Sequence, residues 1–404
     1  MKRLLAALTL TMSCCFGYFV VEDDYAKQVE VLKSLDIDTS FLQDSVFVSM
    51  KDNIRNYKTK QFLKVLENGM QFVPVLKKMI EEAEIPDVFL YLAMAESGFS
   101  ANAYSKAKAS GLWQFMAPTA KKYNLTIDDY VDERRDPVKS TEAAIKYLRV
   151  LHERFGKWYL AAMAYNCGEG KVSKAIAQAG TDNLYVLLDE DKKYLPLETR
   201  NYIRKIITMA YLSQDVNFLL DNGASYILNG GGMNSPFVKV DIYGGSSLTD
   251  VAEAIDVSMQ ELLAYNAHLK YFFTPPNKEK YHIYIPSGKL TQFKNDFKME
   301  KGNSKYYVYT VTKGDSLQKI AKQYDVNYKV IKDFNSMRSD TIRAGQKLII
   351  PTAHSIRYHT IQKGDTLHSI STKYKLTVAQ LMQTNNLKDS TIIPGTKLEI
   401  PVGN

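Results

Sequence analysis

One glutamate at the end of an apolar segment is well placed for acid–base chemistry. Glu96 follows the run VFLYLAMA (88–95), and Ser97 and Gly98 come directly after it, a pair typical of a helix end. A carboxyl group there faces the negative end of the helix dipole, and apolar neighbours withhold solvation, so its pKa should rise. A carboxylic acid that is neutral near pH 7 can protonate a glycosidic oxygen. The alternative is a glutamate that points into water at a frayed helix end.

Three short motifs supply further groups that could surround such an acid. They are the stretches 96–116, 164–170 (AYNCGEG) and 198–202 (ETRNY). The polar, aromatic and thioether side chains that they contribute are Ser97, Ser105, Gln114, Met116, Tyr165, Asn166, Glu198 and Tyr202. For the tyrosines the alternative is ordinary core packing. Trp113 is expected in a core rather than in a site.

No second acid lies close to Glu96 along the chain. The next ones after it are Asp128, Asp129, Asp132, Glu133 and Asp136. Most glycosidases need two carboxyl groups, about 5 Å or about 6.5–9.5 Å apart. A site with Glu96 alone therefore needs a substrate that supplies its own nucleophile. The sequence has no His/Cys cluster with metal-ligand spacing, and we expect neither a metal nor a cofactor.

Helices must position these residues. From about residue 29 to 214, segments such as 71–85, 140–155 and 199–214 carry apolar residues at three- and four-residue spacing, and strand-like alternation is nearly absent. Prolines stand at or near the expected helix starts, namely Pro86, Pro118, Pro137 and Pro196. This part of the chain is predicted to be an all-α domain.

The N-terminus has the pattern of an export signal. Lys2 and Arg3 precede 18 uncharged residues, 4–21, which are followed by acidic residues. The alternatives are a membrane anchor, because 18 residues reach the lower edge of spanning length, and lipidation at Cys14 or Cys15. Each places the rest of the chain outside the cytoplasm, in the periplasm or cell envelope. Cys167 then remains as a lone cysteine, expected to be a small buried side chain rather than a nucleophile.

Composition limits the class of protein. The chain has 404 residues, 45% of them hydrophobic and 24% charged, which is ordinary for two to four globular domains. These values exclude a disordered chain and a polytopic membrane protein. The formal net charge of +8 is too small to indicate nucleic-acid binding, but it suits a polyanionic surface such as a cell wall.

The C-terminal part repeats itself. Gly314-Asp315 matches Gly364-Asp365 fifty residues later, and the same step relates Leu317 to Leu367, Asn335 to Asn385 and Pro351 to Pro401. The sequence pattern of each copy predicts a strand, two helices and a second strand, in that order. A weaker copy around Gly245 and Asn266 precedes the first of these copies by 69 residues. It lacks the Gly-Asp turn, so we expect its fold but not its binding capacity. A hinge at 229–236 and a polar linker at 289–304 separate these parts.

The motifs of the helical part resemble those of family 1 lytic transglycosylases in the goose-type lysozyme-like superfamily, in particular the membrane-bound lytic murein transglycosylase D group. The resemblance rests on Glu96-Ser97, SGLWQFM (110–116), AYNCGEG (164–170) and ETRNY (198–202). It covers about 110 residues. The order of a catalytic domain followed by repeats is also that of this group.

This resemblance implies roles for single residues. Glu96 is the catalytic acid and base, Ser105, Gln114 and Met116 line the site, and Tyr165 holds Glu96 or the sugar. Asn166 shapes the floor, and Glu198 and Tyr202 close the cleft. The implied reaction cleaves peptidoglycan and leaves 1,6-anhydro-N-acetylmuramic acid, with the N-acetyl group and the C6 hydroxyl of the substrate replacing a second acid. A lysozyme-type hydrolase and a non-catalytic wall-binding scaffold remain alternatives.

The units at 306–351 and 358–401 resemble LysM modules, which bind glycans containing N-acetylglucosamine. The resemblance implies a groove between the first strand-to-helix loop and the loop after the second helix. The residues that would line it are Gly314, Asp315, Ser316, Ile342, Gly364, Asp365, Thr366 and Ile392. The alternative is that the Gly-Asp pairs only cap helices.

The sequence thus predicts an α+β multidomain chain. In order, its parts are a signal peptide or membrane anchor (1–21), a helical segment (25–70), an all-α lysozyme-like catalytic domain (71–228), a degenerate LysM-like module (237–286) and two βααβ LysM modules (306–351 and 358–401). Its expected partners are peptidoglycan glycan strands, not nucleic acid, with membrane attachment through the N-terminal segment as an option.

Overall fold

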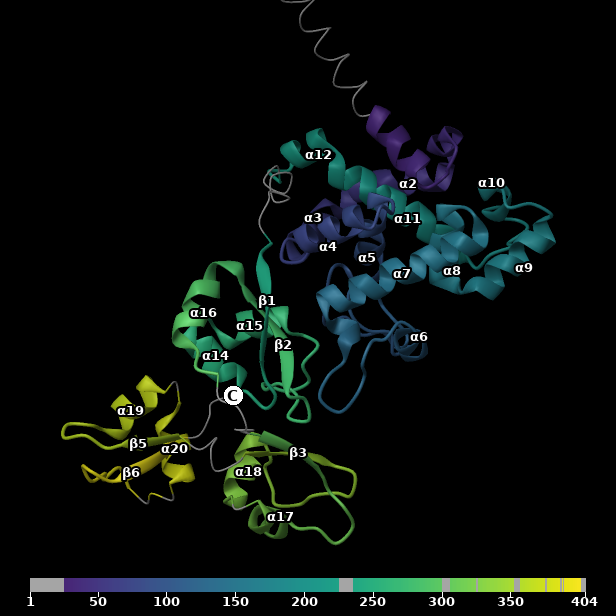
Figure 1. Cartoon of the computed structure of the whole chain (residues 1–404). Coiled ribbons are helices and arrows are strands. Elements are labelled where there is room, and N and C mark those ends of the chain that lie inside the picture. Colours follow the sequence, from purple (N-terminus) through teal and green to yellow (C-terminus); the bar gives the residue numbers. More distant parts are fainter. Residues whose placement is uncertain are drawn as a thin grey trace, which may run out of the picture. The chain divides into compact units, whose positions relative to one another are not determined.

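A computed structural model describes residues 25–224, 235–299, 306–324, 326–351, 357–374, 376–385, 387 and 389–400. The predicted export signal at 1–21 and most of the predicted hinge lie outside these residues. Over the described ranges, no helix is both long enough and apolar enough to span a bilayer. The chain divides into two compact units, Met1–Phe237 and Val238–Asn404 (Figure 1).

The first unit is helical, as predicted. Residues 25–34 are helical, and the further elements are η1 (Thr39–Gln43), α2 (Ser45–Asn53), η2 (Ile54–Lys58), α3 (Thr59–Gly69), α4 (Val73–Glu82), η3 (Asp87–Phe89), α5 (Leu90–Ser97), α6 (Ala117–Lys122), η4 (Glu133–Arg135), α7 (Pro137–Phe155), α8 (Trp158–Cys167), α9 (Glu169–Ala179), α10 (Leu184–Leu187), α11 (Leu197–Gln214) and α12 (Val216–Asp221). The prolines lie at helix starts: Pro118 and Pro137 are in first turns, and Pro86 and Pro196 are N-caps.

Helix α11 lies at the centre of this unit and packs against α2, α5 and α8 (Figure 1). Close packing is possible because α5 and α8 present small side chains to the core. Ala93 in α5 and the pair Ala161 and Ala162 in α8 have no exposed surface. Such residues let helix backbones approach, so the C-terminal end of α5 is held against α11.

The N-terminal helical segment is tied to α11 by a buried ion pair. The guanidinium of Arg204 donates to both carboxylate oxygens of Asp44, at 3.0 and 2.9 Å. Asp44 is also the N-cap of α2 and accepts from the backbone N–H of Phe47. One carboxylate therefore caps α2 and fastens it to α11.

The second unit contains three βααβ modules. The two repeats are β3 (Tyr306–Thr310), α17 (Leu317–Gln323), α18 (Tyr328–Phe334) and β4 (Lys347–Pro351), and β5 (Arg357–Thr360), α19 (Leu367–Lys373), α20 (Val378–Thr384) and β6 (Lys397–Ile400). In each the strands pair antiparallel, with Tyr306 opposite Pro351 and Arg357 opposite Ile400. The helices begin fifty residues apart, as the repeat predicts.

The weaker copy has the same fold with one helix more. It comprises β1 (Phe237–Tyr243), α14 (Leu248–Ala254), α15 (Met259–Tyr265), β2 (Lys280–Pro286), η5 (Ser287–Lys289) and α16 (Leu290–Asp296). The linker prediction for 289–304 is wrong over its first part, because α16 packs against α14 and buries Phe293. A single buried aromatic in a polar helix gives little sequence signal.

An asparagine after the second helix makes structural contacts in each module. Asn266 and Asn335 each donate to a carbonyl one turn back and to a carbonyl of the last strand, and each accepts from a backbone N–H of that strand. Asn385 makes the helix contact through Leu381. In the modules of Asn266 and Asn335 this asparagine is therefore a structural residue that joins the second helix to the sheet.

Candidate active site

Glu96 lies where α5 ends against α11. Gly98 takes the left-handed conformation (φ 60°) that stops the helix, as the sequence predicts. The hydroxyl of Tyr202, in α11, donates to Glu96 Oε1 at 2.5 Å. The glutamate is thus held by the neighbouring helix rather than left to fray into water.

Burial controls the acidity of Glu96. Loss of solvation raises the pKa of this carboxyl above its ordinary value, and the negative charge of Glu198 adds to the rise. The Tyr202 hydrogen bond and the positive charge of Lys205 act in the opposite direction without cancelling it. A raised pKa is what proton donation requires.

Lys205 is a site residue that the sequence analysis missed. Its ammonium donates to the carbonyl of Ala95 at 2.7 Å, at the C-terminal end of α5. Burial lowers the pKa of Lys205, and the charge of Glu96 opposes that shift. Glu198, Tyr202 and Lys205 stand at i, i+4 and i+7 in α11 and share one face. That spacing was the signal available in the sequence.

Tyr165 supports the site but does not hold Glu96. Its hydroxyl donates to the backbone carbonyl of Trp113 at 2.8 Å, and its ring packs against Phe115 and Tyr147. Tyr202 is the tyrosine bonded to Glu96. Trp113 is fully buried, as expected, and its indole N–H donates to Thr141.

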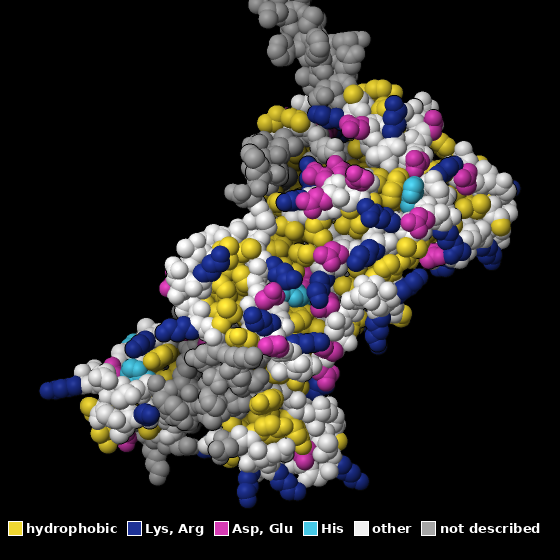
Figure 2. Space-filling view, viewed as in Figure 1, with side chains coloured by type: hydrophobic (Ala, Val, Ile, Leu, Met, Phe, Trp, Pro, Cys, Tyr) yellow, Lys and Arg dark blue, Asp and Glu magenta, His cyan; other side chains and the backbone are white. Residues whose placement is uncertain are grey.

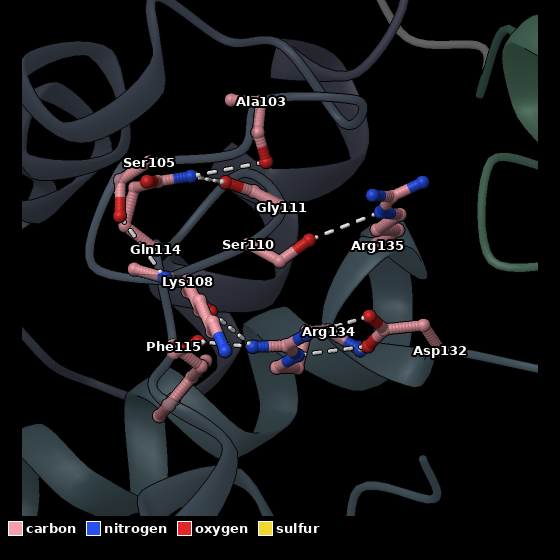
Figure 3. Close-up of polar contacts among 11 residues, drawn as sticks. Ala103, Ser105, Lys108, Ser110, Gly111, Gln114, Phe115, Asp132, Arg134 and Arg135 are labelled. Carbon is pink, nitrogen blue, oxygen red and sulfur yellow. Dashed lines mark hydrogen bonds and ion pairs between the residues drawn. The ribbon is translucent and has the colours of Figure 1, made fainter. Parts of the chain in front are cut away.

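The loop between α5 and α6 carries the predicted lining residues. The Gln114 amide donates to the carbonyls of Gly111 and Ala103, at 2.8 and 3.3 Å, and Ser105 Oγ accepts from the backbone N–H of Ala109 (Figure 3). Gln114 has a φ of 48°, which these contacts hold in place. Both polar side chains fix the loop, while Met116 remains 42% exposed.

A buried arginine fastens this loop to the domain. Arg134 donates twice to Asp132, at 2.8 and 2.7 Å, and its third nitrogen donates to the carbonyls of Lys108 and Phe115 (Figure 3). Gly111 lies against the same residue, because an added Cβ would stand 1.8 Å from the Arg134 carbonyl oxygen. These contacts explain why residue 111 is a glycine and why an aspartate stands at position 132, after the loop.

Three of the acids that follow Glu96 in sequence have structural partners. Asp132 binds Arg134, Glu133 accepts from Lys139 and from the backbone of Thr126, and Asp136 caps α7. The acid within electrostatic reach of Glu96 is Glu198, which is exposed. Among the described residues, the site therefore centres on one carboxyl group.

Two further predicted residues have local partners. Ser97 donates to the carbonyl of Ala93, one turn back in α5. Asn166 accepts from the hydroxyl of Thr199 at 2.7 Å, which ties the end of α8 to the start of α11. Cys167 is half-buried rather than fully buried as expected, and this partial burial raises the pKa of its thiol.

The Gly-Asp turns of the two repeats are built alike. Gly314 and Gly364 have φ of 94° and 98°, and Asp315 and Asp365 each accept from a backbone N–H three residues back. Each aspartate also binds a side chain of the first strand, the Tyr309 hydroxyl or His359 Nε2.

Helix capping takes up the next position of each turn. Ser316 and Thr366 are the N-caps of α17 and α19. Ile342 and Ile392 pack against the two module cores. These eight residues therefore at least shape and stabilise the loops in which glycan contact is expected.

Comparison with known protein families identifies the parts of the chain. Residues 75–187 match the transglycosylase SLT domain. Residues 309–351 and 359–401 match the LysM domain, and 236–298 match the LysM-like domain of the lytic transglycosylase MltD. The last match includes α16.

Known proteins share this organisation in part. The membrane-bound lytic murein transglycosylase D of Escherichia coli (strain K12) is 26% identical over 349 residues, covering 78% of this chain and 73% of that protein. The N-acetylmuramoyl-L-alanine amidase sle1 of Staphylococcus epidermidis is 34% identical over 110 residues, covering 27% of this chain and 32% of the amidase.

Solved structures of soluble lytic transglycosylases align with part of this chain. An inactive mutant of Slt from Pseudomonas aeruginosa is 22% identical and covers 37% of this chain and 24% of that protein, with a TM-score of 0.29. Slt70 from Escherichia coli is 24% identical and covers 38% and 25%, with a TM-score of 0.28. The family matches carry the assignment: the chain is a lytic transglycosylase with an SLT domain, an MltD-type LysM-like domain and two LysM domains.

Proposed function

We propose that this lytic transglycosylase cleaves the β-1,4 bond between N-acetylmuramic acid and N-acetylglucosamine in peptidoglycan, with Glu96 as its sole acid and base. The observation that carries the proposal is the state of this carboxyl group. Burial raises its pKa, and Tyr202 holds it at the end of α5. Three of the acids that follow it in sequence are engaged in structural contacts.

The first step is proton donation. The neutral Glu96 gives its proton to the glycosidic oxygen, the bond from that oxygen to C1 of the muramic residue breaks, and N-acetylglucosamine leaves as an alcohol. The N-acetyl oxygen of the muramic residue stabilises the positive charge at C1. The proposal needs no second carboxylate from the enzyme, because the N-acetyl oxygen of the substrate takes its place.

The second step returns the proton to the enzyme. The Glu96 carboxylate takes the proton of the C6 hydroxyl, whose oxygen then bonds to C1 and closes the 1,6-anhydro ring. No water is consumed. In the proposed cycle, Tyr202 and Lys205 stabilise the carboxylate between the two steps, because both favour the ionised form of Glu96. Their contacts let one group act first as acid and then as base.

The LysM domains are proposed to bind the glycan and keep the enzyme on the cell wall. Several weak sites on one chain raise the local substrate concentration without tight individual binding. Gly314, Asp315, Gly364 and Asp365 would shape the binding loops through the turn contacts described above. We place the enzyme in the cell envelope, exported through its N-terminal segment.

Digestion of purified peptidoglycan by the wild type and by Glu96→Gln tests the proposal. Glutamine keeps an oxygen that accepts from Tyr202 but has no proton to donate, so the variant should release no soluble fragments. Products one water lighter than reducing ends indicate anhydro rings, whereas reducing ends would assign a lysozyme-type hydrolase. Wild-type inactivity on both sacculi and soluble strands would leave only a wall-binding scaffold.

A further inference from the structure

A polar groove lies along α2 and η2, in the N-terminal helical segment of the catalytic unit. It has a volume of about 560 Å³. Its lining is dominated by exposed polar side chains with one aromatic ring, and it includes Ser45, Ser49, Asp52, Asn53, Asn56 and Tyr57. Most of these residues recur at three- and four-residue spacing, so they share one face of the helical segment. The segment thus presents hydroxyls and amides to one hollow.

The groove carries little charge. Figure 2 shows Lys and Arg side chains among acidic ones over the catalytic unit, and the exposed side of α4 carries the ion pairs Lys77–Glu81 and Lys78–Glu82. The described lining of the groove contains Asp52 as its single charged residue. Its polar side chains form no hydrogen bond with other described residues of the chain. Neutral donors and acceptors are therefore available together to an uncharged polar ligand.

Tyr57 adds an apolar surface to this polar groove. It is 82% exposed, more than any other large hydrophobic side chain among the described residues. A tyrosine offers a ligand a flat apolar ring and a hydroxyl at the same time, and such residues are enriched where proteins bind partners. A ring face beside amides suits a sugar, because a sugar ring has an apolar C–H face and a polar rim of hydroxyls.

The backbone at the groove is an unusual turn that is held in place. Residues Ile54–Lys58 form a π-helix, a rare form that is frequently found at functional sites. The hydroxyl of Thr59 bonds to two carbonyls within this turn. Towards α12, Arg55 forms an ion pair with Asp215 and lies over the ring of Phe218. The exposed side chains of the turn therefore project from an anchored backbone, which lowers the entropic cost of binding a ligand.

We propose that this groove is a glycan-binding site that holds an N-acetylated amino sugar. None of its lining residues belongs to the motifs around Glu96. The inference rests on the proposed function, because that function makes a polymer of N-acetylated sugars the ligand of the enzyme. The C–H face of the sugar packs on Tyr57, and the acetamido group pairs with the side-chain amides of Asn53 and Asn56.

Two properties of the groove favour this ligand class. Its volume of about 560 Å³ lies in the range of about 300–1,000 Å³ that is usual for sites of small ligands. Lysine and arginine are absent from its described lining, which disfavours anionic ligands such as phosphates and carboxylates. The groove therefore gives the catalytic unit a contact with the glycan in addition to those of the LysM domains.

Hydroxyl-radical footprinting of the full chain, read by mass spectrometry at Tyr57, tests the inference. The probes are chitotetraose, a tetramer of N-acetylglucosamine, and maltotetraose, a glucose chain of the same length without acetamido groups. Tyr25 is the internal control, because it is 54% exposed and does not line the groove.

Two variants are matched in the groups that they lose. Asn53→Ala/Asn56→Ala removes two amides from the groove, and Gln61→Ala/Asn68→Ala removes two exposed amides from α3. Alanine has the highest helix propensity, so both variants should keep the fold.

We expect chitotetraose at about 5 mM to slow the oxidation of Tyr57 about fivefold, the protection given by a site with a Kd of about 1 mM. Tyr25 should be oxidised at an unchanged rate, and maltotetraose should not protect Tyr57. The protection should disappear in Asn53→Ala/Asn56→Ala and persist in the α3 variant.

Three results would overturn the inference: no protection of Tyr57 in the wild type, equal protection by maltotetraose, or undiminished protection in the groove variant. Inactivity of the wild type on peptidoglycan would refute the proposed function by itself. The footprint remains interpretable in that case, because it measures binding and requires no bond cleavage.

Discussion

Removal of one hydroxyl should change the pH dependence of the enzyme in a defined direction. Tyr202→Phe keeps the ring but deletes the donor that lies 2.5 Å from Glu96 Oε1. This bond favours the ionised carboxylate, so its loss raises the pKa of Glu96 further. A hydrogen bond to a charged group contributes about 1.5–3 kcal/mol. At about 1.4 kcal/mol for each pKa unit, this equals one to two units.

We expect the lower end of that range, about one unit, because Glu96 is partly exposed and water can replace the hydroxyl. The acid must be protonated in the free enzyme, so kcat/KM falls as pH rises through its pKa. The basic limb of the profile should therefore move up by about one unit, measured with soluble glycan strands over a pH series.

Tyr165→Phe is the matched control. It deletes a hydroxyl that donates to Trp113 rather than to Glu96. Activity should fall because the loop is less firmly held, but the basic limb should remain at the wild-type pH. A limb that stays in place in Tyr202→Phe, or moves to lower pH, would refute the assignment of Glu96 as the group whose protonation controls the rate.

Three further outcomes are expected. Asp132→Ala leaves the buried Arg134 without its counter-charge. It should destabilise the catalytic unit by about 3–5 kcal/mol and lower its Tm by roughly 10 °C in calorimetry, whereas the exposed Asp191→Ala should have little effect. Because the folded-state pKa of Glu96 is raised, its ionisation destabilises the fold as pH rises from the unfolded-state pKa through the folded-state value. Glu96→Gln should therefore be more stable than the wild type to urea at pH 8 and equal to it at pH 3.5; equal stability at both would contradict the burial argument. Deletion of 237–404 should preserve activity on short soluble glycans and weaken it on whole sacculi, and equal activity on both would refute the targeting role of the LysM domains.

Local patterns were sufficient to predict much of the fold. The apolar run, Ser97 and Gly98 define the end of α5 because a helix stop depends on a few adjacent residues. The step of fifty residues defines the two repeats because each unit has the same short-range turn and cap. The rise in the pKa of Glu96 could also be predicted from its apolar neighbours in sequence. In the structure, the largest cause of this rise is the loss of solvation by burial.

Long-range partners could not be predicted in this way. Arg134 reaches back across 19 and 26 residues to the carbonyls of Phe115 and Lys108, which no periodicity indicates. Lys205 meets the end of α5 across 110 residues. The bond to Glu96 from Tyr202 rather than from Tyr165 could not be predicted for the same reason, since only the crossing of α5, α8 and α11 determines which hydroxyl reaches Glu96.

The central claim is that one carboxyl group performs both proton transfers and that the substrate's own hydroxyl replaces water. Digestion of peptidoglycan in water enriched in heavy oxygen, followed by mass spectrometry of the released fragments, tests it most directly. The account predicts anhydro ends that carry no heavy oxygen with the wild type, and no fragments with Glu96→Gln. Heavy oxygen at the new ends, or cleavage by the variant at the wild-type rate, would contradict it.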